Sequence, residues 1–349
     1  MENKTVKAAA DGSVYIPMAE RTGEESVVFF TRDLSPAGLQ KIFKRVSQVL
    51  EGKICVKVHT GEKNGPNIIP CSWIAELFQD EKLKDATIIE TNTLYEGDRY
   101  TTQQHRETLQ VNGWTFSPVD ILDADGTVML PVTGGKWFTE MSMGKNLVNY
   151  DSLFTLTHFK GHTTGGFGGS AKNLGIGCAD GQVGKHLIHL NPEAAGKKWS
   201  ASGELFMERM VESTKAVVDF FGKKVCYVNV MRNMSVSCDC EGLKAKPVVT
   251  PDVGICASLD LLAVDQACVD LIYALEPADR KAMVERIESR GGHRQLSYMK
   301  ELGMGNNRYT LLDIDNDDAP ISPAEAVKGV VPFSRDNKKA RDGEKRISL

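Results

Sequence analysis

The sequence has no long apolar run, no basic block and none of the common catalytic signatures. No apolar segment approaches the roughly 20 residues that a membrane-spanning helix needs. The N-terminal segment lacks the apolar core of a secretory signal. The formal net charge is −4 over 349 residues, without a basic cluster of the kind that binds nucleic acid. We therefore expect a cytoplasmic protein with no membrane span and no nucleic-acid partner.

Motifs of several enzyme classes are also missing. A phosphate loop at Gly184 and Lys185 requires glycine at position 179 and Ser or Thr at 186, but the chain has Ala179 and His186. His-Glu-x-x-His, the nucleophile elbow and Ser-His-Asp patterns do not occur. Residues 166–171 match the dinucleotide-binding glycine spacing, but more glycines follow at once and no acidic residue stands at the required distance. These tests disfavour nucleotide hydrolysis, zinc proteolysis, serine hydrolysis and a Rossmann site.

The overall pattern of the chain is that of an α/β protein. Hydrophobic residues make up 41% and charged residues 25%, as in ordinary globular domains, and a core usually divides at this length. Strand-type and helix-type segments alternate, and residues 203–221 form a strongly amphipathic helical pattern. We predict a mixed, mainly parallel sheet flanked by helices, in two closely packed lobes, 25–150 and 151–315. Residues 1–24 are predicted to be a loose arm and 316–349 a charged extension with little structure.

Polar turns follow two of the predicted strands. Residues 53–59 alternate between apolar and polar and end at His59, and residues 86–91 lead into Glu90-Thr91-Asn92-Thr93. Open α/β sheets bind ligands at the carboxyl ends of their strands. We therefore expect His59 to lie at a ligand site.

Residues 152–191 are the most unusual stretch of the sequence. A strand-like run leads into nine glycines between Gly161 and Gly184, and four of the seven histidines lie in this stretch. Glycine at this density indicates positive φ angles or close approach to a ligand, although a flexible surface loop is the alternative. We predict His158, His162 and Lys172 as catalytic residues, with the alternative that each histidine is a satisfied loop residue. The predicted cofactor-binding residues are Gly165, Gly166, Gly168, Gly169, Lys172, Asn173 and His59.

The eight cysteines fall into groups according to their surroundings. Three lie in apolar strand or helix patterns typical of a core, namely Cys55, Cys226 and Cys268, and Cys71 at the start of a helix is unassigned. A Cys-x-Cys pair in a loop directs two thiols toward one place, and thiolates are soft ligands for iron–sulfur clusters, zinc or nickel. Metal ligation and unmetallated thiols are both compatible with the pattern. The predicted metal ligands are Cys178, Cys238, Cys240 and Cys256.

The motifs of this sequence resemble those of the family called domain of unknown function 362. The resemblance rests on His158-Phe-Lys-Gly-His162, on residues 165–179 and on Cys238-Asp-Cys240, and further on residues 56–63, 90–95 and 252–267. It covers about residues 25–315. Family members are commonly described as iron–sulfur proteins, many with an inserted ferredoxin-type cysteine run, and residues 190–205 of this chain contain no cysteine.

The family resemblance implies an iron–sulfur redox protein of anaerobic metabolism, an oxidoreductase that acts on a small anionic substrate. A 4Fe–4S cluster is then held by Cys178, Cys238 and Cys240, with Cys256 or a histidine as fourth ligand, unless the fourth iron stays open for substrate. A non-enzymatic alternative is an electron-transfer or assembly role with a redox partner protein. The sequence leaves homodimer formation open.

The segment from His162 to Lys172 is also similar to the histidine–glycine–lysine segment of nickel-pincer lactate racemases. In those enzymes the lysine carries the cofactor covalently, the histidine acts as acid and base, and a later histidine ligates nickel. The similarity implies these roles for Lys172, His162 and either His186 or His189. It implies an acid/base or hydride-shuttling enzyme for a 2-hydroxy acid, with a nickel-pincer nucleotide as cofactor.

Overall fold

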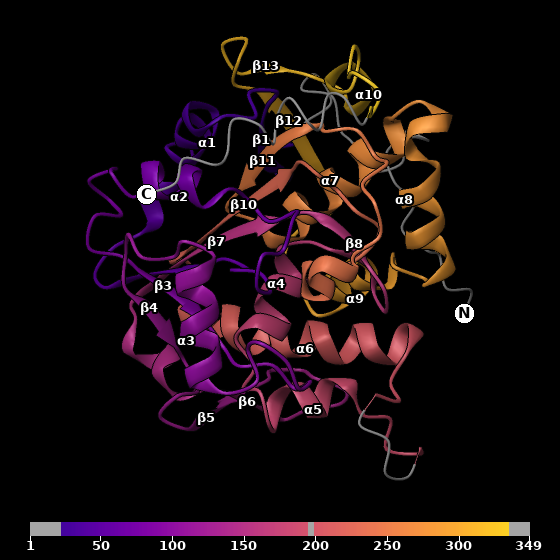
Figure 1. Ribbon diagram of the computed structural model, residues 1–349. Helices are drawn as coiled ribbons and strands as arrows, with labels where there is room; N and C mark the ends of the chain where they lie inside the picture. The colour runs from indigo at the N-terminus through magenta and orange to yellow at the C-terminus, as the bar shows by residue number, and fades with distance from the viewer. Residues whose placement is uncertain (1–21, 195–198, 335–349) are drawn as a thin grey trace.

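A nine-stranded sheet runs through the centre of the computed structural model, which describes residues 22–194 and 199–334 (Figure 1). Five of its eight strand pairs are parallel and three are antiparallel. The predicted α/β fold with a mixed, mainly parallel sheet is therefore confirmed. In spatial order the strands are β13 (Ala319–Pro320), β12 (Tyr309–Asp313), β1 (Ser26–Thr31), β11 (Gly254–Ser258), β10 (Val225–Met231), β7 (Ser152–His158), β2 (Ile54–Lys57), β3 (Thr87–Glu90) and β4 (Val119–Ile121).

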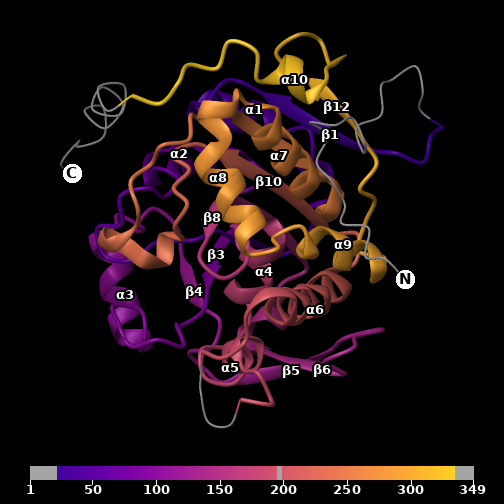
Figure 2. The ribbon, with the colours of Figure 1, turned by 90° about the vertical axis from the view of Figure 1, so that its right-hand side faces the viewer.

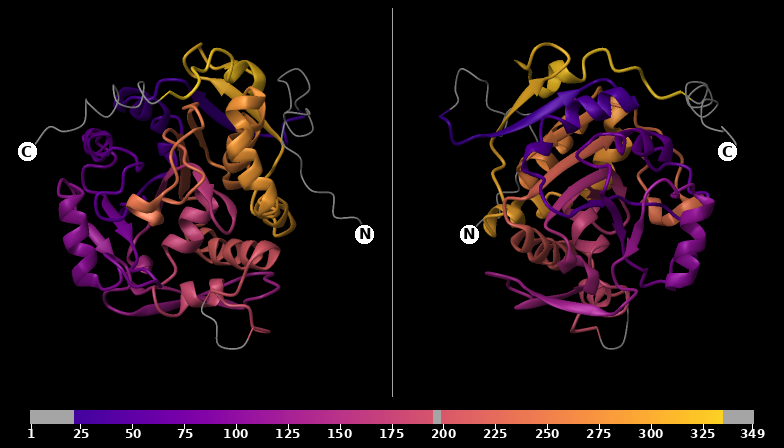
Figure 3. Two further views of the ribbon diagram at one scale, coloured as in Figure 1. Left: turned by 45° about the vertical axis from the view of Figure 1, so that its right-hand side comes forward. Right: turned by 90° about the vertical axis from the view of Figure 1, so that its left-hand side faces the viewer.

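Helices cover both faces of the sheet (Figures 2 and 3). One face carries α1 (Pro36–Phe43), α2 (Cys71–Leu77) and α3 (Thr102–Val111). The other carries α4 (Ser170–Gly177), α6 (Gly203–Phe221), α7 (Leu261–Ala274), α8 (Pro277–Ser289), α9 (Arg294–Glu301) and α10 (Pro323–Ala326). Because side chains alternate along a strand, β7 directs Leu153 to this second face and Phe154 to the first, where its ring lies 4.8 Å from that of Phe43. All seven residues of β7 are therefore buried, as expected of a strand covered on both sides.

The glycine-rich segment forms regular structure beside the sheet. It contains β8 (Lys160–His162), which pairs with β9 (Gly166–Gly168), and then α4 and α5 (Gly184–His189). The alternative of a structureless surface loop is therefore wrong. A second small sheet pairs β5 (Thr127–Pro131) with β6 (Glu140–Gly144). The helix predicted at 203–221 is confirmed as α6, whose apolar side chains pack against α4 and α9.

Strands from both predicted lobes interleave within the large sheet. β1 lies between β12 and β11, and β7 lies between β10 and β2. The division into lobes 25–150 and 151–315 stays a prediction. Residues 1–21 of the predicted arm and 335–349 of the predicted extension lie outside the described residues. Within 316–334 the chain is more ordered than expected, because Ser322 caps α10 and Ala326 is buried against the core.

None of the helices in residues 22–194 and 199–334 is long and apolar enough to span a bilayer.

His105 on α3 gives the fold a predictable response to acid. Its side chain is fully buried, with Nδ1 3.3 Å from Asn92 Oδ1, and burial lowers the pKa of His105 from 6.5 to about 3. The unfolded chain takes up a proton near pH 6.5 whereas the folded protein does not, so the free energy of unfolding should fall as the pH drops below that value. In the wild-type protein His105 should lower the free energy of unfolding by up to about 1.4 kcal/mol for each pH unit below 6.5. His105→Gln should abolish this contribution. Urea unfolding at neutral and mildly acidic pH measures the difference.

His186 provides the control, because it is only partly buried. His186→Gln should leave the dependence of stability on pH unchanged. An equal dependence in wild type and His105→Gln would show that His105 does not contribute.

Candidate active site

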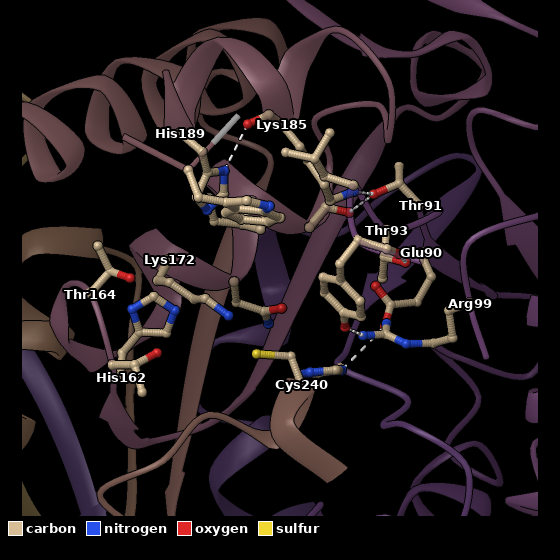
Figure 4. A pocket seen from close by; sticks show the side chains of 18 of the residues that line it. Glu90, Thr91, Thr93, Arg99, His162, Thr164, Lys172, Lys185, His189 and Cys240 are labelled. Atoms are coloured by element: carbon tan, nitrogen blue, oxygen red, sulfur yellow. Dashed lines mark hydrogen bonds and ion pairs between the residues drawn. The ribbon is translucent and has the colours of Figure 1, made fainter. Parts of the chain in front are cut away.

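A pocket of about 240 Å³ opens at the carboxyl ends of β2 and β3 (Figure 4). The loops after these strands form one wall, and α4 and α5 form another. Cys240 closes a third side from η5 (Asp239–Lys244), a short 3-10 helix. The position agrees with the rule that parallel strands place ligands at their carboxyl ends. His59 lines this pocket, as do Glu90, Thr91 and Thr93 of the second polar turn.

Glu90 at the end of β3 joins two basic side chains. It accepts a hydrogen bond from Lys57 Nζ at 2.8 Å and lies 3.5 Å from Arg99 Nη1. Arg99 also donates to Glu62 at 2.6 Å. Burial alone would raise the pKa of Glu90, but Lys57, His59 and Arg99 together hold it well below its ordinary value. Glu90 is therefore ionised, and this network is neutralised within the protein.

Lys185 and Lys172 face the pocket without a carboxylate partner among the described residues. Lys185 Nζ donates to the carbonyl groups of Asn92 (2.6 Å) and Ala179 (2.8 Å), and burial lowers the pKa of Lys185 to about 8. Lys172 Nζ donates to Cys238 Sγ at 3.3 Å. Burial opposes the charge of Lys172, but the neighbouring sulfur atoms raise its pKa above the ordinary value. Both side chains thus add positive charge to the pocket at neutral pH.

His162 of β8 is held as one tautomer. Its Nδ1 accepts a hydrogen bond from the Gly165 backbone N–H at 2.9 Å, so in the neutral ring the proton is on Nε2. Burial lowers the pKa of His162, so the ring is neutral at pH 7, and it stacks on Phe206 with centroids 5.8 Å apart. Nε2–H can donate to a neighbouring sulfur or to a bound ligand. In Figure 4, His162, Lys172 and Cys240 surround the same space.

Cys238 and Cys240 contact each other at the start of η5. Cys238 is fully buried, and its Sγ accepts a hydrogen bond from the Cys240 backbone N–H at 3.4 Å. A hydrogen bond from the Cys240 thiol, together with Lys172, His162 and His59, holds the pKa of Cys238 well below its ordinary value. The pKa of Cys240 is raised for the same reason, because its proton is shared with the neighbouring sulfur. Of the two thiols, Cys238 is therefore the one that gives up its proton first.

Asp239, between the two cysteines, ties their loop to the end of β7. Its carboxylate lies 2.8 Å from His158 Nδ1 and 3.2 Å from Lys160 Nζ. His158 Nε2 also lies 2.6 Å from the Arg232 carbonyl, so both ring nitrogens have partners. His158 was predicted to be catalytic, but it does not line the pocket, and its contacts are those of a residue that positions the cysteine loop.

The glycines predicted to bind a cofactor pack against the protein instead. Gly165, Gly166, Gly168 and Gly169 are not among the residues that line the pocket. A Cβ on Gly169 would lie 2.4 Å from Asp265 Oδ1. Asp265 accepts hydrogen bonds from the first backbone N–H groups of α4, at 2.7 and 2.9 Å. The end of α4 that could bind an anion is therefore occupied by a carboxylate of the chain itself.

The four cysteines predicted to be metal ligands do not meet. Cys238 and Cys240 are adjacent, whereas Cys256 on β11 contacts Cys268 of α7 in the core. Cys178 ends α4 and is buried near Lys57. In the part of the chain that the structure describes, no three His, Cys, Asp or Glu side chains are arranged to hold a metal ion. The donor set therefore does not fit a four-thiolate cluster.

Of the remaining predicted residues, Lys172, Asn173, His162 and His189 line the pocket. Lys57, Tyr95, Arg99, Lys185 and Trp199 also line it and were not predicted. The available signal for Lys57 was its position at the end of β2, two residues before His59 and the polar turn. Arg99 and Lys185 stand in sequence contexts that are ordinary for solvated side chains, and their burial depends on tertiary packing.

Comparison with known proteins gives one family and several similar solved structures, two of which follow. The family described as "Domain of unknown function (DUF362)" matches residues 54–270. The lactate racemase apoprotein from Thermoanaerobacterium thermosaccharolyticum is 13% identical, with 71% of this chain and 57% of that chain covered and a TM-score of 0.40. A protein from Thermotoga maritima is 12% identical, with 75% and 58% covered and a TM-score of 0.40. The chain thus spans less than two thirds of the length of either. No curated protein matches.

The bond between His158 and Asp239 should be measurable as stability. His158→Ala leaves the buried Asp239 carboxylate with one partner fewer, and we expect the free energy of unfolding to fall by about 2 kcal/mol. Urea unfolding at pH 7 gives this difference. His186→Ala is the matched control, because His186 is partly exposed and should cost little. Equal losses in the two variants would contradict the role of His158.

Proposed function

The chain belongs to the family described as a domain of unknown function, DUF362, and on that premise we propose that it is an enzyme that acts on a small anionic substrate. The observation that carries the proposal is the charge of the pocket. Four basic side chains line it, Lys57, Arg99, Lys172 and Lys185. Glu90 and Glu62 neutralise Lys57 and Arg99, whereas Lys172 and Lys185 have no carboxylate partner in the described part of the chain. A low dielectric constant around these two amines strengthens their attraction for an anion.

The roles of the residues follow from their bonds. Lys57 is held by an ion pair with Glu90 and Arg99 by one with Glu62, so these two basic side chains have fixed positions in the pocket wall. Among the described residues Lys172 has only a sulfur as hydrogen-bond partner, so it can turn its charge to a substrate. His162 keeps Nδ1 engaged with the Gly165 backbone and presents Nε2–H, which can donate a hydrogen bond to a substrate oxygen. Lys172 and His162 are thus the residues that bind and orient the anion.

An iron–sulfur cluster is the cofactor that the family resemblance implies, but the donors present do not fit it. Cys240 lines the pocket and Cys238 is buried behind it, whereas Cys178 and Cys256 lie elsewhere. We assign no step of the reaction to a cluster.

Anion binding tests the proposal directly. We expect lactate, oxalate or inorganic phosphate to bind the wild-type protein in isothermal titration calorimetry, with an affinity that falls as salt is added. Lys172→Met keeps the length of the side chain and removes its charge, and should weaken binding by about tenfold or more, the value of one charge-assisted hydrogen bond. Lys300→Met, an exposed position on α9, is the control and should bind as wild type does. The proposal fails if none of the anions binds, or if Lys172→Met binds as tightly as wild type.

A nickel-pincer enzyme is the second candidate, favoured by the meeting of Lys172, His162 and His189 in one pocket. His189 Nδ1 donates to the Lys185 carbonyl at 2.7 Å, which leaves the Nε2 lone pair free, and burial lowers the pKa of His189 to about 4. An oriented neutral imidazole is a good metal ligand. His186 does not line the pocket, so His189 fits the ligand role better. A pincer nucleotide bound to Lys172 supplies a hydride acceptor for a 2-hydroxy acid.

Intact mass distinguishes the two candidates. Protein purified anaerobically from its own cells should carry an added mass at Lys172 if the pincer candidate holds, and Lys172→Arg should lack it. Nickel, iron and acid-labile sulfide are measured on the same sample. The mass of the unmodified chain without nickel would contradict the pincer candidate and leave the first proposal standing.

A further inference from the structure

We propose that Cys238 and Cys240 form a redox-active dithiol that reduces a small anionic disulfide bound in the pocket. The charge of this substrate rests on the proposed function, whereas the dithiol itself rests on the contacts of the two cysteines.

The two sulfur atoms are placed to form a disulfide. Residues two apart in sequence have Cα atoms no more than about 7 Å apart, within the upper range for disulfides. Cys238 Sγ already accepts a hydrogen bond from the Cys240 backbone N–H at 3.4 Å. Bond formation therefore needs side-chain rotation and no rearrangement of the sheet.

The loop that carries the thiols is held on both sides. Asp239 is bonded to His158 and Lys160, at 2.8 and 3.2 Å. Glu241 accepts from the Cys238 backbone N–H at 3.1 Å and from the Ser237 hydroxyl at 2.9 Å. Fixed neighbours keep two thiols in contact at a high effective concentration.

The thiols differ in access to the pocket. Cys240 lines it, whereas Cys238 is fully buried behind it, against Lys172. An oxidant in the pocket therefore meets Cys240 first. Lys172 attracts an anionic oxidant and also stabilises negative charge on sulfur during exchange.

The reaction balances without a further cofactor. The Cys240 proton passes to Cys238, and the Cys240 sulfur attacks one sulfur of the substrate disulfide, which breaks the substrate S–S bond and releases one thiolate. The Cys238 sulfur then attacks Cys240, closes the protein disulfide and releases the second half of the substrate, to which its proton passes. Two electrons move from the cysteines to the substrate, which leaves as one thiol and one thiolate. A dithiol reductant regenerates the protein.

A second pair of touching thiols serves as internal control. Cys256 and Cys268 are also in contact, but both are fully buried in the core and neither lines the pocket. Cys71 is the other cysteine that is not fully buried in the part of the chain described, and it lies outside the pocket. Contact alone should thus not confer reactivity, and Cys268→Ser should behave as wild type.

The test uses two disulfide probes, dithiobis-nitrobenzoate with two carboxylates and the neutral dithiodipyridine. With a limiting amount of either probe, each molecule consumed should release both of its halves. The tryptic peptide of residues 233–244, which contains both cysteines, should then lack two hydrogen atoms and carry no probe. Cys238→Ser should release one half only and retain the other as a mixed disulfide on Cys240.

Rates separate this inference from the proposed function. The ratio of the reaction rate with the dianionic probe to that with the neutral probe should be at least ten times the same ratio measured for free cysteine. Lys172→Met should reduce this ratio to that of free cysteine. A stable mixed disulfide in wild type, or modification of Cys71 alone, overturns the dithiol while anion binding by calorimetry still stands. Closure at equal rates with both probes supports the dithiol and overturns the anionic substrate.

Discussion

Burial of positive charge is the constraint on which the site depends. Lys57, Arg99, Lys172 and Lys185 each expose less than a tenth of their surface, and an unpaired charge in such a place would be expensive. The protein solves the problem in three ways. Carboxylates neutralise Lys57 and Arg99, oxygen acceptors surround the amine of Lys185, and a sulfur accepts from Lys172. The last solution is the unusual one, because the partner is itself a reactive group.

The fold could be predicted from the sequence because its signals are local. The apolar period of residues 203–221 is enough to define α6, and the polar turns after β2 and β3 mark the ligand-binding edge of the sheet. The glycines were misleading because a glycine indicates that another group lies too close for a side chain, but not whether that group is a ligand or part of the protein. At Gly169 the space is filled by Asp265, which joins from α7. No local sequence pattern predicts a partner that lies this far away in the chain.

The cysteines show the same limit in another form. Cys-Asp-Cys correctly indicated two thiols directed to one place, since residues two apart cannot separate. Cys256 looked equally exposed to chemistry but meets Cys268, because β11 packs under α7. The sequence also contained no indication that Asp239, between the two cysteines, would hold their loop in place. Asp239 connects the loop to β7, a strand whose residues are all buried, and so links the two sulfur atoms to the interior of the sheet.

The place of β1 in the sheet bears on how the protein is made. This first strand has β11 on one side and β12 on the other, and the Ser258 hydroxyl donates to the Val27 carbonyl across 231 positions of the sequence. During synthesis β1 therefore leaves the ribosome long before either neighbour exists, with both edges unpaired. Contacts so distant in sequence close late and leave strand edges open to wrong partners in the meantime. β1 therefore has no partner in the sheet until β11 and then β12 have been translated.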